Sequence, residues 1–452
     1  MIGMALPYRR TAIPDGNLTL FNITVTNYRQ PRASELVFIP SNMMQWSVRD
    51  TDIGVRAKLD GNSGIFKLRG SALMQARRVN LTATSLLQLS IRQNIEMRLL
   101  ACAVEIGEVD LEILDGGLPG DFINNNKARI INEMRPDLEK EVCRALDQFV
   151  SRQINSQMRR MPLKSDDLFI DYTPLRPPIV TPYHIELQTV GEVSKYGTGG
   201  TPFGSVRIPD TYYKPTLKML YITMTDYVPN SMLYSMFRND KLTIHVTPDD
   251  KYLGQYMKTS CNTGTELKIC LGDAVPELSE QRPNLDTELL YFAKRAPAMV
   301  FTEQKNGTVN VDMVGLMFIL VRESDDARGQ SMLKQVLSVD ANVLAKSELN
   351  FLSKTVETTE TGFERFDFTV RTSNLKGINP GDRLDNLALV SKELLRTISD
   401  KFLSDGLPIP TFDGIRFLDQ EVITMDRGIQ LGTDFVIEQS LVDQITTSLI
   451  GG

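Results

Sequence analysis

The stretch NSMLYSMFRNDKLTIHVT, residues 230–247, changes its hydrophobic period halfway through. In its first half, apolar residues recur at helical spacing: Met232, Leu233, Met236 and Phe237. After residue 240, the apolar positions 242, 244 and 246 alternate with polar ones, as in a half-buried strand. The stretch therefore predicts a helix that is capped at Asn230 or Ser231 and runs almost directly into a strand.

Strand-type alternation dominates residues 17–114. LTLFNITVTNY, residues 18–28, alternates throughout, and GVRAKLDGNSGIFKLRG, residues 54–70, is typical of a hairpin that turns at residues 60–64. Another alternating stretch follows from residue 86 to residue 114. We expect long antiparallel strands here.

The period becomes helical after residue 122. Apolar residues fall at Ile123, Ile130, Met134, Leu138, Val142, Leu146 and Val150. From residue 130 their spacing is four, and we expect one continuous apolar face that packs into a curved sheet. Pro136 should kink this helix or start a second one.

A Gly/Pro-rich segment divides the chain. We interpret SKYGTGGTPFGSVRIP, residues 194–209, as a linker, because its glycines do not form the GxxxxGK[ST] pattern of a phosphate loop. On both sides, long strands are followed by a long amphipathic helix; the second helix, residues 384–402, has its apolar stripe at Leu387, Leu394, Ile398 and Phe402. We expect two similar domains, residues 1–193 and 210–452.

Composition is that of a globular protein. The 452 residues are 42% hydrophobic and 23% charged. The sequence contains no run of about 18 apolar residues, the length that is needed to span a bilayer. Residues 1–160 contain 21 Lys and Arg against 17 Asp and Glu, whereas the rest contains 29 against 39. An acidic chain with one Trp offers no broad basic surface for nucleic acid, but the charge balance of residues 1–160 allows a local basic face there.

Cysteines and N-x-T triplets bear on the compartment. Two disulfides, Cys102–Cys143 and Cys261–Cys270, would fit an oxidising compartment, and four buried free thiols are the alternative. Four triplets have the form of glycosylation acceptors: Asn17, Asn22, Asn80 and Asn306. The N-terminal residues do not form a signal peptide, because basic residues follow the short apolar patch instead of preceding it.

Residues for catalysis are scarce. His184 and His245 are the only histidines, and both lie in stretches whose alternation predicts strands. No GxSxG, HExxH or CxxC motif is present. We therefore predict no catalytic residues, no metal site and no cofactor. The remaining candidates for function are the apolar faces, which either line a site for a lipid-like ligand or pack as ordinary core.

Several stretches resemble one known family. Residues 230–247 are similar to the start of the C-terminal barrel of the bactericidal/permeability-increasing, lipopolysaccharide-binding and lipid-transfer proteins. VPELSEQRPNLDTELLYFAKRAPAMVF (275–301) and GLPIPTFDGIRFLDQEVITMDRGIQLGTDF (406–435) also match, the latter resembling a Pro-containing strand pair of the family. Cys102 and Cys143 resemble the family's strand-to-helix disulfide. The matches run in order from about residue 17 to residue 437.

The resemblance implies an α+β fold. Two barrel-plus-long-helix domains would form a boomerang, joined by a central antiparallel sheet. It also implies secretion and a Cys102–Cys143 bond. Because the resemblance begins near residue 17, the N-terminal part of the first barrel is expected to be missing, and Ile130, Met134 and Leu138 should be more exposed than Leu387, Leu394 and Ile398.

The resemblance also implies a function. Each barrel would hold phospholipid or lipopolysaccharide, in innate defence or in lipid transfer; a non-lipid structural protein with filled barrels is the alternative. Candidate pocket residues are Ile130, Met134, Leu138, Met232, Leu233, Met236, Phe237, Leu387, Leu394 and Ile398. Arg56, Lys58, Lys67 and Arg69 are expected on one face of their hairpin, where they could meet an anionic membrane surface or serve as an ordinary solvated face.

Overall fold

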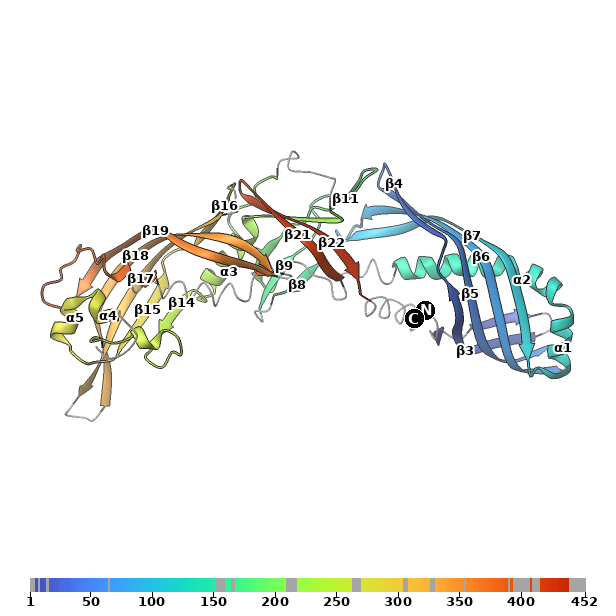
Figure 1. Cartoon of the computed structure of the whole chain (residues 1–452), viewed down its shortest axis with the longest axis horizontal. Helices are drawn as coiled ribbons and strands as arrows, with labels where there is room; N and C mark the ends of the chain where they lie inside the picture. The colour runs from blue at the N-terminus through green and yellow to red at the C-terminus, as the bar shows by residue number, and fades with distance from the viewer. Residues whose placement is uncertain are drawn as a thin grey trace. The chain divides into compact units, whose positions relative to one another are not determined.

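The computed structural model describes most of the chain (Figure 1). The described residues are 5–6, 9–13, 16–63, 66–151, 159–163, 167–208, 218–261, 270–303, 308–325, 330–352, 355–388, 391–392, 407–408 and 415–438. They fall into two compact units. Unit 1 comprises Met1–Arg159, Tyr172–Val190 and Ile437–Gly452, and unit 2 comprises Arg160–Asp171 and Gly191–Val436.

Unit 1 is built on a seven-stranded antiparallel sheet with the order β1-β3-β5-β6-β7, to which β2 and β4 add at β3 and β5. The strands are β1 (Ala5–Leu6), β2 (Arg9–Ile13), β3 (Gly16–Arg29), β4 (Ala33–Ile39), β5 (Met43–Ser63), β6 (Phe66–Leu89) and β7 (Ile95–Leu114). Two helices follow, α1 (Gly117–Asn125) and α2 (Lys127–Phe149), and a short ribbon pairs β10 (Ile179–Val180) with β11 (Ile185–Glu186). The predicted long strands are confirmed.

The predicted hairpin joins β5 to β6. Its strands pair from Ser63 with Phe66 back to Met43 with Leu86. Leu59, Leu68 and Ala72 of the hairpin are buried and form a small core with Ile113 of β7, against which Ile123 of α1 packs. One face of the hairpin is therefore covered by α1, and the other meets solvent.

Pro136 lies inside helix α2, so it does not start a second helix. The break between helices falls instead at Asn126, whose side-chain amide donates to the Phe122 carbonyl oxygen (2.9 Å). The apolar residues do not form one face. At 3.6 residues per turn, a spacing of four advances about 40° around the helix at each step, and Val142 is consequently exposed.

Unit 2 contains more elements than unit 1. They are β8 (Arg160–Pro162), β9 (Leu168–Asp171), β12 (Glu192–Lys195), β13 (Leu220–Thr225), α3 (Tyr227–Arg238), β14 (Thr243–Val246), η3 (Gly254–Tyr256), α4 (Leu271–Ala274), α5 (Pro276–Gln281), β15 (Thr287–Ala293), β16 (Ala298–Thr302), β17 (Thr308–Asp325), β18 (Gln330–Leu352), β19 (Thr355–Ser373), β20 (Leu407–Pro408), β21 (Ile415–Met425) and β22 (Gly428–Ile437). The main sheet has the order β14-β15-β17-β18-β19-β20, with β16 on β17. Two three-stranded sheets, β12-β9-β8 and β13-β22-β21, accompany it. The α+β class is confirmed.

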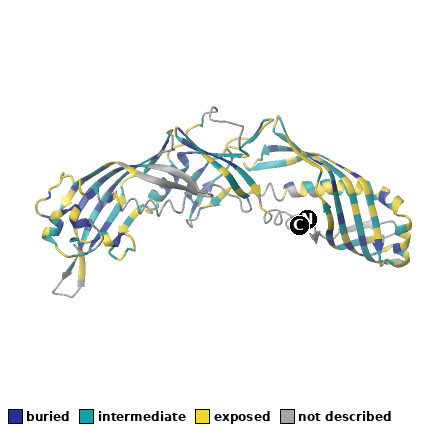
Figure 2. Ribbon diagram, in the orientation of Figure 1, coloured by how far each residue is buried: buried dark blue, intermediate teal, exposed yellow. Residues whose placement is uncertain are grey.

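The main sheet of unit 2 carries a large closed core. Side chains of β15, β17, β18 and β19 pack with α4 and α5 into one cluster of fully buried residues, among them Leu278, Ile319 and Leu337. Figure 2 shows these buried positions as dark bands across the strands. Apolar residues of the sheet's inner face are thus removed from water here.

The stretch at residues 230–247 forms the predicted helix and strand, α3 and β14. The helix begins at Tyr227 with Asp226 at the N-cap position, four residues before the earlier of the two expected caps, and Asn230 has another role. Its side chain donates to the Asp226 and Met299 carbonyl oxygens (both 2.7 Å) and accepts from the Met299 N–H (2.7 Å). Asn230 therefore ties α3 to β16 instead of capping it.

The expected linker is partly structured. Ser194 and Lys195 belong to β12, which pairs with β9 through residues 168–171, so unit 2 already begins at Gly191 and also owns residues 160–171. The second predicted helix lies largely outside the described residues: Leu387 is fully buried, whereas Leu394 and Ile398 fall outside.

Candidate functional site

The inner face of the unit 1 sheet is identified by the disulfide to α2. Cys102 of β7 is bonded to Cys143 of α2, with Cα atoms 5.8 Å apart, so the Cys102 side chain points toward the helix. Residues directly opposite each other on neighbouring strands share a face. The register places Leu36, Trp46 and Ala83 in the same row as Cys102.

Burial changes along this inner face. Val48, Ala83 and Val104 are buried, whereas Trp46 is 40% exposed and Leu36 is 50% exposed. Phe38 and Met44, one pair further along β4 and β5, are half-buried and share this face. We call Leu36, Phe38, Met44 and Trp46 the open apolar face; these large side chains remain partly in water at the edge of a packed sheet.

Sequence reasoning missed the open apolar face. Its strand was recognisable from alternation, but which alternate side faces the helix depends on the register with Cys102. The signal available was Trp46, the only tryptophan of the chain. The helix residues that were predicted instead, Ile130, Met134 and Leu138, are half-buried along α2.

The opposite face of the hairpin carries the predicted cations. Arg56, Lys58, Lys67 and Arg69 are all exposed and lie on one face, since Asn62 pairs with Lys67 and Asp60 with Arg69. Arg69 forms a 3.2 Å ion pair with Asp60. The four cations therefore share one exposed face, which we call the outer basic face, and the charge of Arg69 is partly neutralised by Asp60.

A second charged cluster lies at the bulges of β5. Arg29 donates to Asp50 (2.6 Å) and through two nitrogens to Asp52 (2.6 and 3.0 Å). The Arg29 guanidinium and then the Arg78 backbone N–H lower the pKa of Asp52 to about 2. This cluster holds its own charges together, so it adds no net basic surface.

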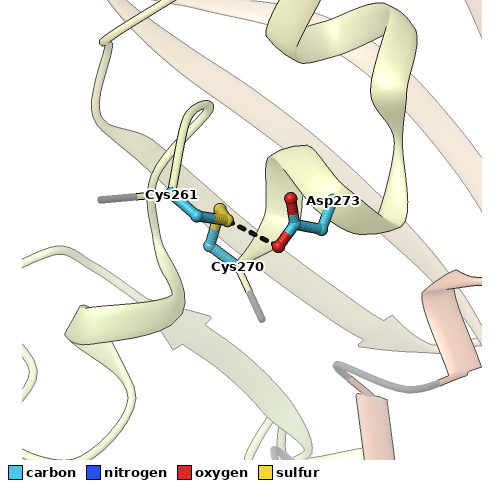
Figure 3. A group of neighbouring side chains, drawn as sticks. All are labelled: Cys261, Cys270 and Asp273. Atoms are coloured by element: carbon cyan, nitrogen blue, oxygen red, sulfur yellow. Dashed lines mark hydrogen bonds between the residues drawn. A yellow bond between two sulfur atoms is a disulfide. The ribbon is translucent and has the colours of Figure 1, made fainter. Parts of the chain in front are cut away.

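Both predicted disulfides are present. The second, Cys261–Cys270, has Cα atoms 5.6 Å apart. Figure 3 shows Asp273, at the start of α4, pointing at this bond, with Oδ2 2.8 Å from the Cys261 Sγ. The three residues are close enough to hold a metal ion, but both sulfurs are used in the disulfide and offer no thiolate ligand.

The predicted residues of α3 are not its most buried ones. Met232, Leu233, Met236 and Phe237 are half-buried. The buried face instead carries Ser231 and Ser235, and the Ser231 hydroxyl accepts the Val193 N–H of β12 (2.8 Å). Small side chains let the helix approach the strand closely, and the apolar stripe lies to the side.

The two histidines make structural contacts. His245 Nε2 lies 2.7 Å from Glu288, a buried carboxylate that also accepts from Arg322 (2.7 Å). Burial alone would raise the pKa of Glu288, but the hydrogen bonds from Arg322 and His245 outweigh it and the pKa is lowered. His184 Nδ1 lies 2.8 Å from the Thr181 hydroxyl within one turn.

The glycosylation candidates differ in accessibility. Asn17 and Asn22 are exposed. Asn80 is half-buried and its Oδ1 accepts the Asp50 N–H (3.0 Å), while Asn306 lies outside the described residues. Among the described residues, Asn17 and Asn22 are therefore the more accessible candidates. Among the described helices, none has the length and apolarity that crossing a membrane would take.

Comparisons with known proteins cover nearly the whole chain. The family model described as LBP / BPI / CETP family, N-terminal domain, matches residues 2–153, and its C-terminal counterpart matches residues 164–437. Human lipopolysaccharide-binding protein is 24% identical over 413 residues, which are 88% of this chain and 78% of that protein. Bactericidal permeability-increasing protein of Rattus norvegicus is 23% identical over 62% of this chain and 56% of its own length.

A solved structure is also similar. The crystal structure of lipopolysaccharide binding protein aligns with 96% of this chain and 93% of its own, at 17% identity and a TM-score of 0.46. The match of the N-terminal family model extends upstream of residue 17, where the resemblance was first evident. With both domain models matched in order over most of its length, the chain belongs to the LBP / BPI / CETP family.

Proposed function

We propose that this protein is a secreted, non-enzymatic lipid-binding protein, and that phospholipid or lipopolysaccharide binds on the open apolar face of unit 1. The observation that carries the proposal is the exposure of Trp46 and Leu36 on the inner side of the sheet. Large apolar side chains that stay in water at a packed face are typical of a binding site. The names of the relatives agree with a lipopolysaccharide or lipid ligand.

The energetic argument favours acyl chains. Each methylene group that leaves water contributes about 0.8 kcal/mol, so a few methylenes on this face give useful affinity with few polar contacts. The two disulfides support an oxidising compartment, as secretion requires. A role in defence is the preferred context of this function, and lipid transfer is the alternative.

Trp46 provides the test, because it is the chain's only tryptophan. Titration with lipopolysaccharide or with phosphatidylcholine vesicles should move its emission to shorter wavelength as lipid replaces water. Leu36→Ser should weaken binding about tenfold, since part of a leucine's burial energy is lost. Val37→Ser is the matched control: Val37 is 41% exposed on the same strand but faces the opposite side.

Three results would contradict the proposal: no emission shift with either lipid, equal binding by Leu36→Ser and the wild type, or equal losses in both variants. Extraction of the purified protein followed by mass spectrometry gives an independent check. Co-purified lipid is expected. Protein that neither carries nor takes up lipid would favour a structural role, with the barrels filled by side chains.

The outer basic face extends this proposal to anionic surfaces. Arg56, Lys58, Lys67 and Arg69 would each contribute up to about 1 kcal/mol near an anionic bilayer at low salt. Replacing all four with Ser should sharply weaken binding to phosphatidylglycerol vesicles and remove its salt dependence, while leaving the emission shift with phosphatidylcholine unchanged. Unchanged binding to phosphatidylglycerol would make these residues an ordinary solvated face.

A further inference from the structure

A polar cavity of about 250 Å³ lies within unit 2, between the glycine-rich turn after β12 and the C-terminal half of α3. Hydroxyl and cationic side chains line it, among them Ser194, Lys195, Thr198, Tyr234 and Arg238. Its volume is below the roughly 300–1,000 Å³ typical of sites for drug-sized ligands. Its size and its hydroxyl and cationic lining fit a small polar group.

The turn that forms one wall has a defined conformation, held by hydrogen bonds. Gly197, Gly199 and Gly200 have positive φ (64°, 74° and 107°), which side-chain-bearing residues rarely adopt. The Ser194 hydroxyl accepts the Gly199 N–H (2.8 Å). Glu192 Oε1 accepts both the N–H and the hydroxyl of Thr201 (2.9 and 2.8 Å), and the other carboxylate oxygen, Oε2, lies beside Gly199.

The cavity has two cations and no carboxylate in its lining. Arg238, in the last turn of α3, pairs with no acidic side chain among the described residues. The Lys195 ammonium lies 3.9 Å from Asp167, which Lys241 binds more closely, and 5.6 Å from the centroid of the Tyr196 ring. Two cationic residues thus line one small polar space, and among the described residues neither forms a close ion pair with a carboxylate.

Neutral donors supplement these charges. The Gly200 N–H finds no acceptor among the described residues, and a Cβ at Gly200 would meet nothing within 4 Å, so the backbone is open to a ligand there. The Ser194 oxygen accepts from Gly199, which leaves its proton available to donate. An oxyanion would satisfy all of these groups at once.

We propose that this cavity binds a phosphate-type oxyanion, held by Lys195 and Arg238 and by the Gly200 N–H. The group could belong to a phospholipid headgroup or be free phosphate, and the chemistry of recognition is the same. This is a polar site in unit 2 and does not rest on the open apolar face of unit 1. The segment that we predicted to be a plain linker therefore supplies one wall of a site.

The test is calorimetric titration of the whole chain with inorganic phosphate and, separately, with a short-chain phosphatidylglycerol below its micelle concentration. Lys195→Gln and Arg238→Gln should each weaken phosphate binding about tenfold, as expected for loss of one charge-assisted contact. The double variant should show no saturable binding. Lys251→Gln is the matched control, since it removes one exposed lysine of unit 2 that does not line the cavity.

Tighter binding of phosphatidylglycerol than of phosphate would identify a headgroup as the source, and equal binding would identify free oxyanion; both support the site. The proposal is overturned if the wild type binds neither probe, or if Lys195→Gln and Arg238→Gln bind as the wild type does. In that case Arg238 only compensates the helix C-terminus. The Trp46 emission shift should persist in all these variants, so failure of this site and failure of lipid binding in unit 1 are distinguishable.

Discussion

The two units use their long sheets differently. In unit 2 the inner face of β17 and β18 is closed into one core, where Ile319 and Leu337 have no exposed surface. In unit 1 the equivalent apolar material is divided between small buried clusters and the open apolar face around Trp46. The same alternating sequence pattern thus leads to core in one unit and to half-exposed surface in the other.

This contrast shows that alternation specifies two faces but not what covers either of them. Burial depends on whether another element packs on the face, and α4 and α5 do so in unit 2. Stability should therefore depend most on unit 2 core residues, while the apolar residues of unit 1 are free to serve a ligand. Four experiments test this difference between the units.

The largest effect is expected from the core. Leu337→Ala should lower the free energy of unfolding by about 2–5 kcal/mol, because it removes a fully buried side chain and leaves a cavity. Leu36→Ala, at a half-exposed position, should cost less than about 1 kcal/mol. Urea unfolding followed by circular dichroism measures the first, and Trp46 fluorescence reports unit 1. Equal costs would show that the two faces are covered alike.

The disulfides should differ with loop length. In the chain-entropy estimate, the 41-residue separation of Cys102 and Cys143 corresponds to about 4 kcal/mol and the nine-residue separation of Cys261 and Cys270 to about 3 kcal/mol. Replacing each pair with Ala should therefore destabilise unit 1 slightly more than unit 2. Thermal unfolding of the two double variants checks this, and a larger loss for the shorter loop would contradict it.

Ion pairs provide the third test. Asp226 is buried at the start of α3 and accepts from two nitrogens of Arg427. Arg427→Gln should cost about 2–3 kcal/mol, less than a fully buried pair, because the guanidinium is partly exposed. Arg29→Gln in unit 1 should cost less than about 1 kcal/mol, since its partners are nearer to solvent. Urea unfolding measures both, and a reversed order would show that burial does not rank these pairs.

The smallest effect concerns pH. The pKa of Asp52 is lowered to about 2 in the folded chain from an ordinary value of 3.8. Its stabilisation is therefore complete above about pH 4 and is lost as the pH falls toward 2. Melting of unit 1, followed by Trp46 fluorescence, should decline over this range, and less steeply in Asp52→Asn. Parallel declines would assign the acid sensitivity to other carboxylates.

Much of the fold could be predicted because local pattern determined it. The β5–β6 hairpin, α3 followed by β14, and α2 all have periodicities that only one element type fits. The failures have two physical causes. Asn230, one of the two expected caps, instead bonds Met299, which is distant in sequence. Val142 was expected on a continuous apolar face, but four-residue spacing advances about 40° per step around the helix and turns it toward solvent.

The candidate site was less predictable than the fold. The basic residues of the hairpin followed from the charge pattern and the Cys102–Cys143 bond from the resemblance, whereas the Cys261–Cys270 bond was one of two alternatives that the sequence left open. Trp46 and Leu36 could not be assigned to an inner or an outer face without the register that links them to Cys102. Lys195 and Arg238 lie 43 positions apart and line the same cavity because β12 packs on α3.

The division of the chain affects both its synthesis and the choice of expression fragments. The chain leaves unit 1 at Arg160, returns at Tyr172 and leaves again at Gly191. A nascent chain therefore emerges with β8 and β9 already made, but their sheet partner β12 follows only after the intervening unit 1 segment. An expression fragment cut between residues 193 and 194 would sever β12 and separate β8 and β9 from the rest of unit 2. Because segments of the two units alternate along the chain, no single cut in the sequence separates them, even though each unit has its own core.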